Sequence, residues 1–274
     1  MNGSPLDENS SHILSSCATV APMPRHSKLT IVAIAVLASA IASLLHEGLG
    51  HGVTAWLRGD TVTELTSNHL NSLRDDRLVS AGGTLVNLAA GFLFFFAARA
   101  AGSRAVLRYF LWFLATLNLL DAAGYFLFSG ALGLGDWADV TAGLPRPIAL
   151  RIVMAVTGAM LYVVFLRALV VGLHPFCPSR GTYNTVGRLP YLASCLFMCL
   201  AGAFDPLGLK LLFLSTVPAF FGGLSGLLWG DVFLPRTAAA ETLEIRPTPA
   251  LWFTAAVAGI AFVAILGRGI EFSH

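Results

Sequence analysis

Seven runs of apolar residues follow one another along the chain, with short polar segments between them. A helix needs about 20 apolar residues to cross the hydrocarbon core of a bilayer, and most runs reach this length. The pattern therefore predicts an all-α, polytopic bundle of transmembrane helices. Only Asp205-Pro206 divides the fifth run from the sixth, so the two form either a helical hairpin or one broken helix, and the bundle has six or seven spans. The runs lie near Leu29–Leu57, Leu78–Ala98, Ala105–Phe128, Ile148–Leu173, Leu189–Phe204, Leu207–Trp229 and Leu251–Leu266.

The composition agrees with a membrane protein. Charged residues make up 12% of the chain, against about 25% in soluble domains, and the mean hydropathy is +0.74. The net charge is +2 and no stripe of basic residues alternates with aromatic ones, so the lipid bilayer is the expected surrounding and nucleic acid is not an expected partner. No Cys-x-x-Cys pair is present among the 4 cysteines, which argues against a cysteine zinc site.

Residues 1–28 are polar, and we expect a disordered N-terminal tail. The first apolar run is longer than the core of a signal peptide, so it is expected to be a retained span. Lys and Arg are more frequent in the segments on the N-terminal side of the bundle, and the positive-inside rule places that side in the cytoplasm. We expect an integral, multi-pass protein of the bacterial inner (cell) membrane, with its N-terminus cytoplasmic.

Polar residues interrupt the first apolar run at positions 45–51 (LHEGLGH). Ionisable side chains in a span are costly and indicate a functional site. Two neutral imidazoles that hold a zinc ion, next to a glutamate that deprotonates the bound water, are typical of a catalytic zinc site. His46 and His51 are therefore candidate metal ligands, and Glu47 is the candidate general base. The alternative is that one histidine binds nothing and the pair is a polar packing feature.

The spacing of the two histidines calls for an irregular helix. Zinc-binding helices of this kind carry their histidines at i and i+4, whereas His46 and His51 stand at i and i+5. A regular α-helix would point these side chains roughly 140° apart. A π-bulge inserts one residue into a turn and restores the shared face, and Gly48 and Gly50 make such a distortion inexpensive. The sequence therefore predicts a bulged helix.

Three segments, in this order, carry a family resemblance. Residues 45–65 (LHEGLGHGVTAWLRGDTVTEL) contain the His-Glu and His motif, with Gly48 as an additional residue, and then a Val-x-Glu segment. Residues 80–91 (SAGGTLVNLAAG) contain Gly83 and Asn87 at the positions of an Ala-Gly-Pro-x-x-Asn motif. Residues 114–140 contain Asn-Leu-Leu, followed by Asp136. Together these segments resemble the site-2 protease family of intramembrane zinc metalloproteases.

The resemblance implies a three-helix metalloprotease-like core in residues 29–140, and residues 141–274 would add further transmembrane helices. It favours Asp136, next to Gly135, as the third zinc ligand; an ordinary surface turn is the alternative for this segment. Asp121 is the alternative ligand, or else it orients a ligand histidine through a hydrogen bond. Asn87 either positions the substrate or joins helices through its amide.

The implied activity is that of a zinc metalloendopeptidase. Zn²⁺-activated water would hydrolyse a peptide bond in or near the membrane, and the partner would be a membrane-embedded protein substrate. One alternative is a catalytically inactive homologue that binds membrane proteins, and another is an ion- or proton-coupled membrane transporter. The remaining histidines are expected to be solvated, and Tyr125 is expected to be lipid-facing or core bulk; these histidines are His12, His26, His69 and His174.

Overall fold

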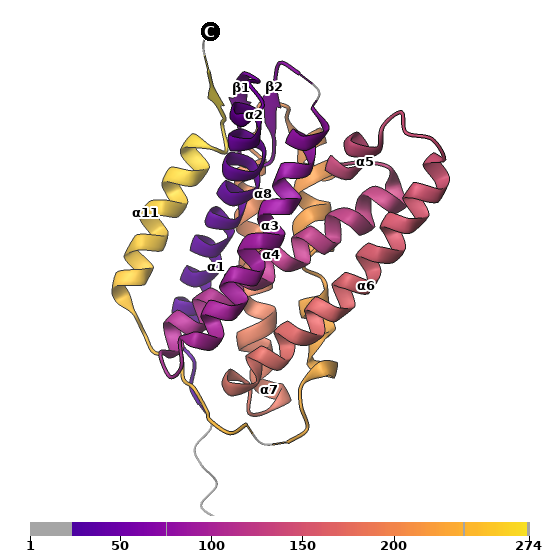
Figure 1. Ribbon diagram of the computed structural model, residues 1–274. Helices are drawn as coiled ribbons and strands as arrows, with labels where there is room; N and C mark the ends of the chain where they lie inside the picture. Colours follow the sequence, from indigo (N-terminus) through magenta and orange to yellow (C-terminus); the bar gives the residue numbers. More distant parts are fainter. Residues whose placement is uncertain (1–23, 75, 238, 273–274) are drawn as a thin grey trace, which may run out of the picture.

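The computed structural model describes residues 24–74, 76–237 and 239–272, and it is a bundle of helices with a small sheet at one end (Figure 1). Six of its helices are long and apolar enough to cross a membrane. The predicted helical membrane bundle is therefore confirmed, and six helices among the described residues reach the length of a span. The seventh apolar run forms a shorter helix of 17 residues. The six spans are Lys28–Leu57, Arg77–Ala100, Ala105–Leu132, Pro147–Gly172, Arg180–Gly202 and Leu209–Phe233.

The first half of the chain supplies three spans and two strands. The first span changes its helical type along its length, from α to π and back to α, and a hairpin links it to the second. Its elements are α1 (Lys28–Ser43), the π-helix η2 (Leu44–Val53), α2 (Thr54–Leu57), β1 (Val62–Leu65), β2 (Leu70–Ser72), α3 (Arg77–Ala100), α4 (Ala105–Leu132) and α5 (Asp136–Thr141).

The second half is less regular. The fifth span begins at Arg180, nine residues before the predicted Leu189, and short helical segments make up the sixth. Its elements are α6 (Pro147–Leu173), η3 (His174–Phe176), α7 (Arg180–Tyr183), η4 (Asn184–Arg188), α8 (Leu189–Gly202), α9 (Leu209–Leu211), η5 (Leu212–Thr216), η6 (Pro218–Gly222), α10 (Gly226–Trp229), η7 (Gly230–Phe233), α11 (Pro249–Ile265) and β3 (Ile270–Glu271). The fifth and sixth runs are thus separate helices, divided by the loop 203–208.

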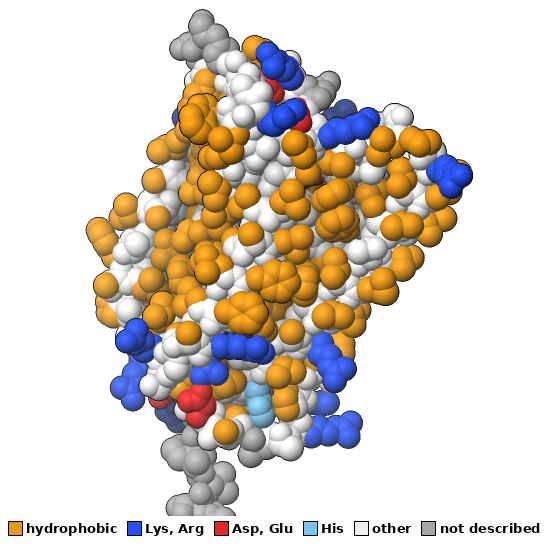
Figure 2. Space-filling model, in the orientation of Figure 1, with side chains coloured by type: hydrophobic (Ala, Val, Ile, Leu, Met, Phe, Trp, Pro, Cys, Tyr) orange, Lys and Arg blue, Asp and Glu red, His pale blue; other side chains and the backbone are white. Residues whose placement is uncertain are grey.

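Helix α4 lies at the centre of the bundle, between α3 and α6. Its side chains Phe113, Leu117 and Leu120 are buried in one apolar cluster that also includes residues of α1, α6 and α8. Helix α6, in contrast, exposes apolar side chains such as Ile152 and Val163. Figure 2 shows such side chains as an apolar belt, with Lys and Arg at its two ends. Exposed apolar surface of this extent fits contact with lipid tails, as expected of a multi-pass membrane protein.

A three-stranded antiparallel sheet, in the order β2-β1-β3, lies at one end of the bundle. The all-α prediction holds for the spans but omits this sheet. Strand β1 contains the Val-x-Glu segment that the family resemblance includes. Strand β3 is only two residues long and pairs Glu271 with Glu64, so no local pattern marks it. Strands β1 and β2 contact η2, so the sheet lies next to the polar residues of the first span.

Part of the predicted N-terminal tail lies outside the described residues, and so does His12. His26, for which we predicted a solvated ring, is instead fixed by two hydrogen bonds: its Nε2 donates to the Phe176 carbonyl at 2.8 Å, and its Nδ1 accepts from the Ile245 amide at 3.1 Å. The prediction was wrong because these partners come from chain segments far away in the sequence. Residues 24–27 therefore pack against the bundle before α1 begins.

Candidate metal centre

Helix η2 brings the two histidines of the first span together. Over Leu44–Val53 the backbone forms a π-helix, in which i→i+5 hydrogen bonds place residues five apart on one face. The Nε2 atoms of His46 and His51 lie 3.2 Å apart, and both side chains are buried. The predicted irregularity is thus confirmed, although it extends over the whole ten-residue segment rather than a single turn.

Glycines allow this helix to lie against α3. A methyl group on Gly50 would come within 2.5 Å of the Gly83 Cα, so the two backbones touch. A methyl group on Gly83 would lie 2.6 Å from Nε2 of both His46 and His51. Gly48, by contrast, has no atom within 4 Å of that position. Gly50 and Gly83 are therefore required for close packing, whereas Gly48 faces open space.

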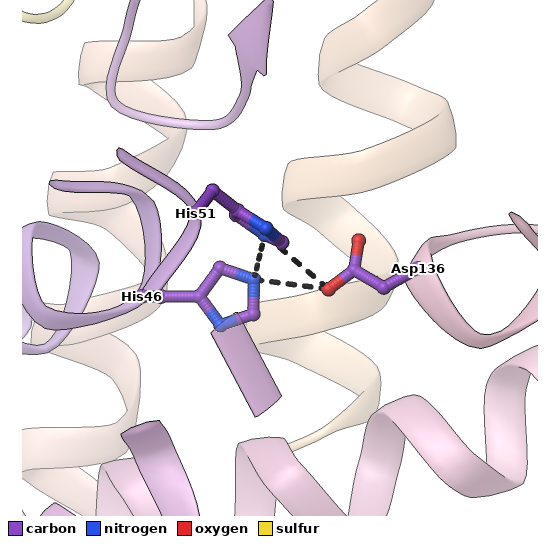
Figure 3. A group of neighbouring side chains, drawn as sticks. All are labelled: His46, His51 and Asp136. Carbon is purple, nitrogen blue, oxygen red and sulfur yellow. Dashed lines mark hydrogen bonds and ion pairs between the residues drawn. The ribbon is translucent and has the colours of Figure 1, made fainter. Parts of the chain in front are cut away.

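Asp136 approaches the two imidazoles from the other side. Helix α4 ends at Gly133, and both Gly133 (φ 70°) and Gly135 (φ 79°) adopt left-handed backbone conformations that favour glycine. The chain thereby turns back, and α5 begins with Asp136. The Asp136 Oδ2 atom lies 3.2 Å from His46 Nε2 and 3.5 Å from His51 Nε2. Figure 3 shows the three side chains pointing toward one another.

The three atoms form a group that could hold a metal ion. The Nδ1 atom of His51 donates to the Val79 carbonyl at 2.7 Å, so in the neutral ring the Nε2 lone pair faces the Asp136 carboxylate. Such an arrangement is repulsive unless a proton or a metal cation lies between the groups. Ligand atoms about 2.0–2.2 Å from a tetrahedral zinc ion are roughly 3.3–3.6 Å apart, which is close to the separations of 3.2, 3.2 and 3.5 Å between these three atoms.

The charge state of Asp136 fits this role. Burial of the Asp136 carboxyl would raise its pKa, but hydrogen bonds from the His46 and His51 rings, when these carry a proton on Nε2, outweigh burial and hold the pKa below its usual range; a bound metal ion would take the place of those protons. The carboxyl is therefore ionised at neutral pH. An ionised carboxylate and two imidazole lone pairs are the donor set of many zinc sites.

A second set of contacts holds His46 in place from behind. The Asn87 Nδ2 atom lies 3.0 Å from His46 Nδ1 and donates to Asp121 Oδ2 at 2.5 Å. Asp121 itself is 3.6 Å from His46 Nδ1, the ring nitrogen that faces away from Asp136. The candidate metal group therefore contains Asp136 and leaves out Asp121. Of the two, Asp121 carries the acceptor that a ligand histidine needs for its Nδ1–H, whereas the Asn87 amide nitrogen is a donor and holds the Asp121 carboxylate.

Tyr125 is a neighbour of the site that the sequence analysis missed. Its ring stacks on the His46 ring, with centroids 4.9 Å apart and an interplanar angle of 20°. We predicted bulk packing for this residue. Tyr125 lies four residues after Asp121 on α4, and residues four apart share a helix face. That spacing, applied to Asp121, is the signal that would have identified it.

Glu47 is buried next to His46. Its Oε2 atom has no hydrogen-bond partner among the described residues. Arg58, the nearest arginine along the chain, does not pair with Glu47 but donates to Asp76 at 2.8 Å. This hydrogen bond from Arg58 also lowers the pKa of Asp76. Glu47 is thus left as a buried carboxylate whose accepting oxygen is available to a ligand or water.

A large cavity reaches the site from the end of the bundle that carries the sheet. Its volume is about 1110 Å³, at the upper end of the range for small-molecule sites. The polar side chains Glu47, His51 and Asp136 line it together with the chain segment 68–72. Apolar side chains of α4 and of the sixth span form the remaining walls. Asn87 does not line this cavity; it lines a smaller one beside it, together with His46, Glu47 and Asp121.

The fold and the site together define a multi-pass helical membrane protein with a buried His46, His51 and Asp136 group that could hold a metal ion. In comparisons with known proteins, no protein-family model, no curated protein and no solved structure matches this chain.

Proposed function

We propose that the chain is an intramembrane zinc metalloprotease that hydrolyses a peptide bond in or near the membrane. One observation carries the proposal. His46 Nε2, His51 Nε2 and Asp136 Oδ2 converge within 4.8 Å of one another, and the neighbouring Glu47 carboxylate has an oxygen without a hydrogen-bond partner among the described residues. Three ligands and a free base along the wall of a cavity are the requirements of metal-assisted hydrolysis.

The donor set favours zinc. Two imidazoles and one carboxylate are ligands that zinc accepts in hydrolases, and a fourth position then remains for water. Zinc, when bound, lowers the pKa of that water and polarises the scissile carbonyl. His46, His51 and Asp136 would hold the ion, while the Val79 carbonyl and the Asp121 carboxylate, itself held by Asn87, would accept from the Nδ1 atoms of the two rings.

Glu47 would act as the general base. It takes a proton from the attacking water and later gives it to the leaving amine. Its burial in an apolar span keeps bulk water from competing for this carboxylate. His46, Glu47 and His51 all lie in η2. This one short segment therefore positions the base and both histidine ligands.

Strand β2 supports a peptide as the substrate. It forms the edge of the three-stranded sheet, and its outer side is unpaired within the described chain. The same strand lines the cavity next to Glu47 and His51. An extended peptide can pair with such an edge through its backbone, which would present a peptide bond to the site. A pathway for ions alone would have no need of this edge.

Zinc content and hydrolysis together test the proposal. We expect about one zinc per full-length chain, measured by mass spectrometry of the metal, in the wild type and in Glu47→Gln, and loss of zinc in Asp136→Ala. In Glu47→Gln, hydrolysis of a library of labelled single-span peptides should fall by roughly 10²–10⁴-fold, because only the base is removed. Glu241→Gln, which changes a carboxylate outside the cavity, is the matched control.

Two results would count against the protease. A wild-type chain without stoichiometric metal would favour the inactive homologue. A Glu47→Gln variant that alters cation flux in proteoliposomes, with peptide hydrolysis absent in the wild type, would favour the transporter.

A further inference from the structure

His69 occupies an unusual position between two carboxylates. It lies in the turn between β1 and β2, and the sequence analysis predicted a solvated ring. Instead the side chain is only 14% exposed. Its Nε2 atom lies 3.2 Å from Glu64 Oε2 on β1, and its Nδ1 atom lies 3.3 Å from Asp205 Oδ2 in the loop between α8 and α9. The ring therefore connects two segments that are far apart in the sequence.

This geometry favours a protonated ring, because both nitrogens face carboxylates, although the Thr66 hydroxyl also lies 3.0 Å from Nδ1. A neutral imidazole carries one N–H and one lone pair, so one of its nitrogens would face a carboxylate without a proton to donate; the imidazolium donates from both. Asp205 is completely buried, and its other oxygen accepts the Leu207 amide at 2.9 Å. A buried carboxylate is costly unless it is paired. A protonated His69 supplies this pairing for Asp205.

Among the described residues, the charged groups around His69 are acidic. These groups are Glu64 on β1, Glu271 opposite it on β3, Asp205 in the loop and Glu47 on η2. Burial of His69 would lower its pKa, but its hydrogen bonds with Asp205 and Glu64 outweigh burial and raise the pKa. Burial likewise would raise the pKa of Asp205, and the bond with His69 lowers it instead.

One of the two segments that His69 connects, the hairpin, is a wall of the cavity, and the other, the loop 203–208, leads into α9 and η5, which contribute another wall. The hairpin contributes residues 68–72 to the lining, and the chain just after Asp205 contributes Leu211, Leu214 and Ser215. The hairpin includes β2, the strand that lies next to the candidate metal centre. Loss of the link would therefore free one wall of the cavity relative to the other.

We propose that His69 is a positioning residue: as an imidazolium it ties the β1–β2 hairpin to the loop between α8 and α9, and loss of its proton releases this wall of the cavity. The link that His69 makes between Glu64 and Asp205 does not depend on the chemistry at the metal centre. Its effect on peptide hydrolysis rests on the proposed function.

The sign of the pH dependence follows from the two pKa directions. His69 has a raised pKa in the folded chain, so its contribution is complete below its ordinary value of 6.5 and is lost as the pH rises through the folded pKa. Asp205 has a lowered pKa, so its contribution is present above its ordinary value of 3.8 and is lost as the pH falls through the folded pKa. The ion pair between His69 and Asp205 is thus present between the folded-state pKa of Asp205 and that of His69. At higher pH it is lost because His69 loses its proton.

Ring protonation is the direct test. In the full chain labelled with ¹⁵N at histidine, the His69 signal is assigned by its loss in His69→Gln. We expect both ring nitrogens to be protonated below the transition, with a midpoint above 6.5, and the midpoint to fall in Asp205→Asn. A neutral His69 ring at pH 6.5 or below, or a midpoint unchanged by Asp205→Asn, would overturn the proposal.

Hydrogen exchange of the peptide covering residues 62–72 tests the mechanical part. After correction for the intrinsic rate, its protection should fall about tenfold as the pH rises through the His69 transition, because charge-assisted hydrogen bonds are lost. His69→Gln should remove this dependence, and the surface variant His174→Gln should keep it. Protection that does not change with pH in the wild type would contradict the tie, even if His69→Gln failed to fold.

Hydrolysis separates the two proposals. If the labelled peptides are cleaved, His69→Gln should raise KM and flatten the alkaline limb of the pH profile, while zinc content stays unchanged. If no peptide is cleaved under any condition, the protease proposal fails, and the ¹⁵N and exchange results still decide the tie.

Discussion

Gly83 is the residue at which packing and metal binding meet. It lies on α3 against both ring nitrogens of the site, and no larger residue fits without moving an imidazole. A site whose ligands are displaced by a fraction of an ångström loses affinity, because coordination distances vary little. Glycine at position 83 is therefore as necessary for the geometry of the site as the candidate ligands are.

We expect Gly83→Ala to weaken zinc binding by about 10–100-fold while the helical fold is retained, an effect as large as the loss of a group that orients a ligand. Its methyl group would lie 2.6 Å from Nε2 of His46 and of His51. Zinc content after dialysis against a graded chelator measures the change, and circular dichroism checks the fold. Gly48→Ala is the matched control because its methyl group meets nothing within 4 Å. Equal losses in the two variants would contradict this explanation.

The residues that gather at the candidate metal centre could be predicted from the sequence, whereas the residues that surround them could not. His46, Glu47 and His51 are recognisable because ionisable side chains in an apolar run are rare, and Asp136 because Asp next to Gly marks irregular backbone. Tyr125 and His69 were missed. Their roles depend on which distant segment lies opposite: α4 against η2 for Tyr125, and the loop 203–208 against the hairpin for His69.

At the scale of elements, η2 and α5 do most to build the site. The position of the π-helix could be predicted because two histidines five residues apart, with glycines between them, share a face only in such a helix. Its length could not be predicted. The sheet was only partly foreseeable, because β1 is a recognisable strand, while β3 comes from the other end of the chain and contributes only two residues.

Helix α5 depends on an aromatic stack for its place. Trp137, directly after Asp136, stacks on Phe126 of α4 with centroids 4.3 Å apart. An aromatic pair contributes about 0.5–1.5 kcal/mol beyond its buried area, enough to hold a helix of 6 residues in register. Helix α5 also packs against α3, and Arg77 donates to the Ala142 carbonyl at the end of α5 at 2.7 Å, so the stack and these contacts together fix the direction from which Asp136 reaches the histidines.

We therefore expect Trp137→Ala to weaken zinc binding by roughly tenfold, as for loss of a group that orients a ligand, with a smaller effect on thermal unfolding of the bundle. Trp56→Ala removes a tryptophan that is 71% exposed and serves as the control. Zinc titration and a thermal melt of the same samples measure the two quantities. A Trp137→Ala variant with wild-type zinc affinity would show that α5 is placed by other contacts.

At the scale of the whole molecule, the cavity, the sheet and the metal centre lie toward the same end of the bundle. The start of α1 lies at the other end (Figure 1). Basic residues at the α1 end are more numerous than at the sheet end; they are Arg25, Lys28, Arg99, Arg104, Arg108, Arg180, Arg188, Arg236 and Arg246. The positive-inside rule then places the start of α1 in the cytoplasm and the cavity on the opposite side of the membrane.

This topology predicts which side reaches the site. In a cysteine-free background, a cysteine introduced at Thr61, in the loop before β1, should react with a membrane-impermeant maleimide added outside intact cells. A cysteine at Ser103, in the turn between α3 and α4, should react only after the cells are opened. The two positions lie at opposite ends of the bundle, so they should give opposite results in either orientation. The reverse pattern would place the cavity on the cytoplasmic side, and proteolysis would then have to release its products there.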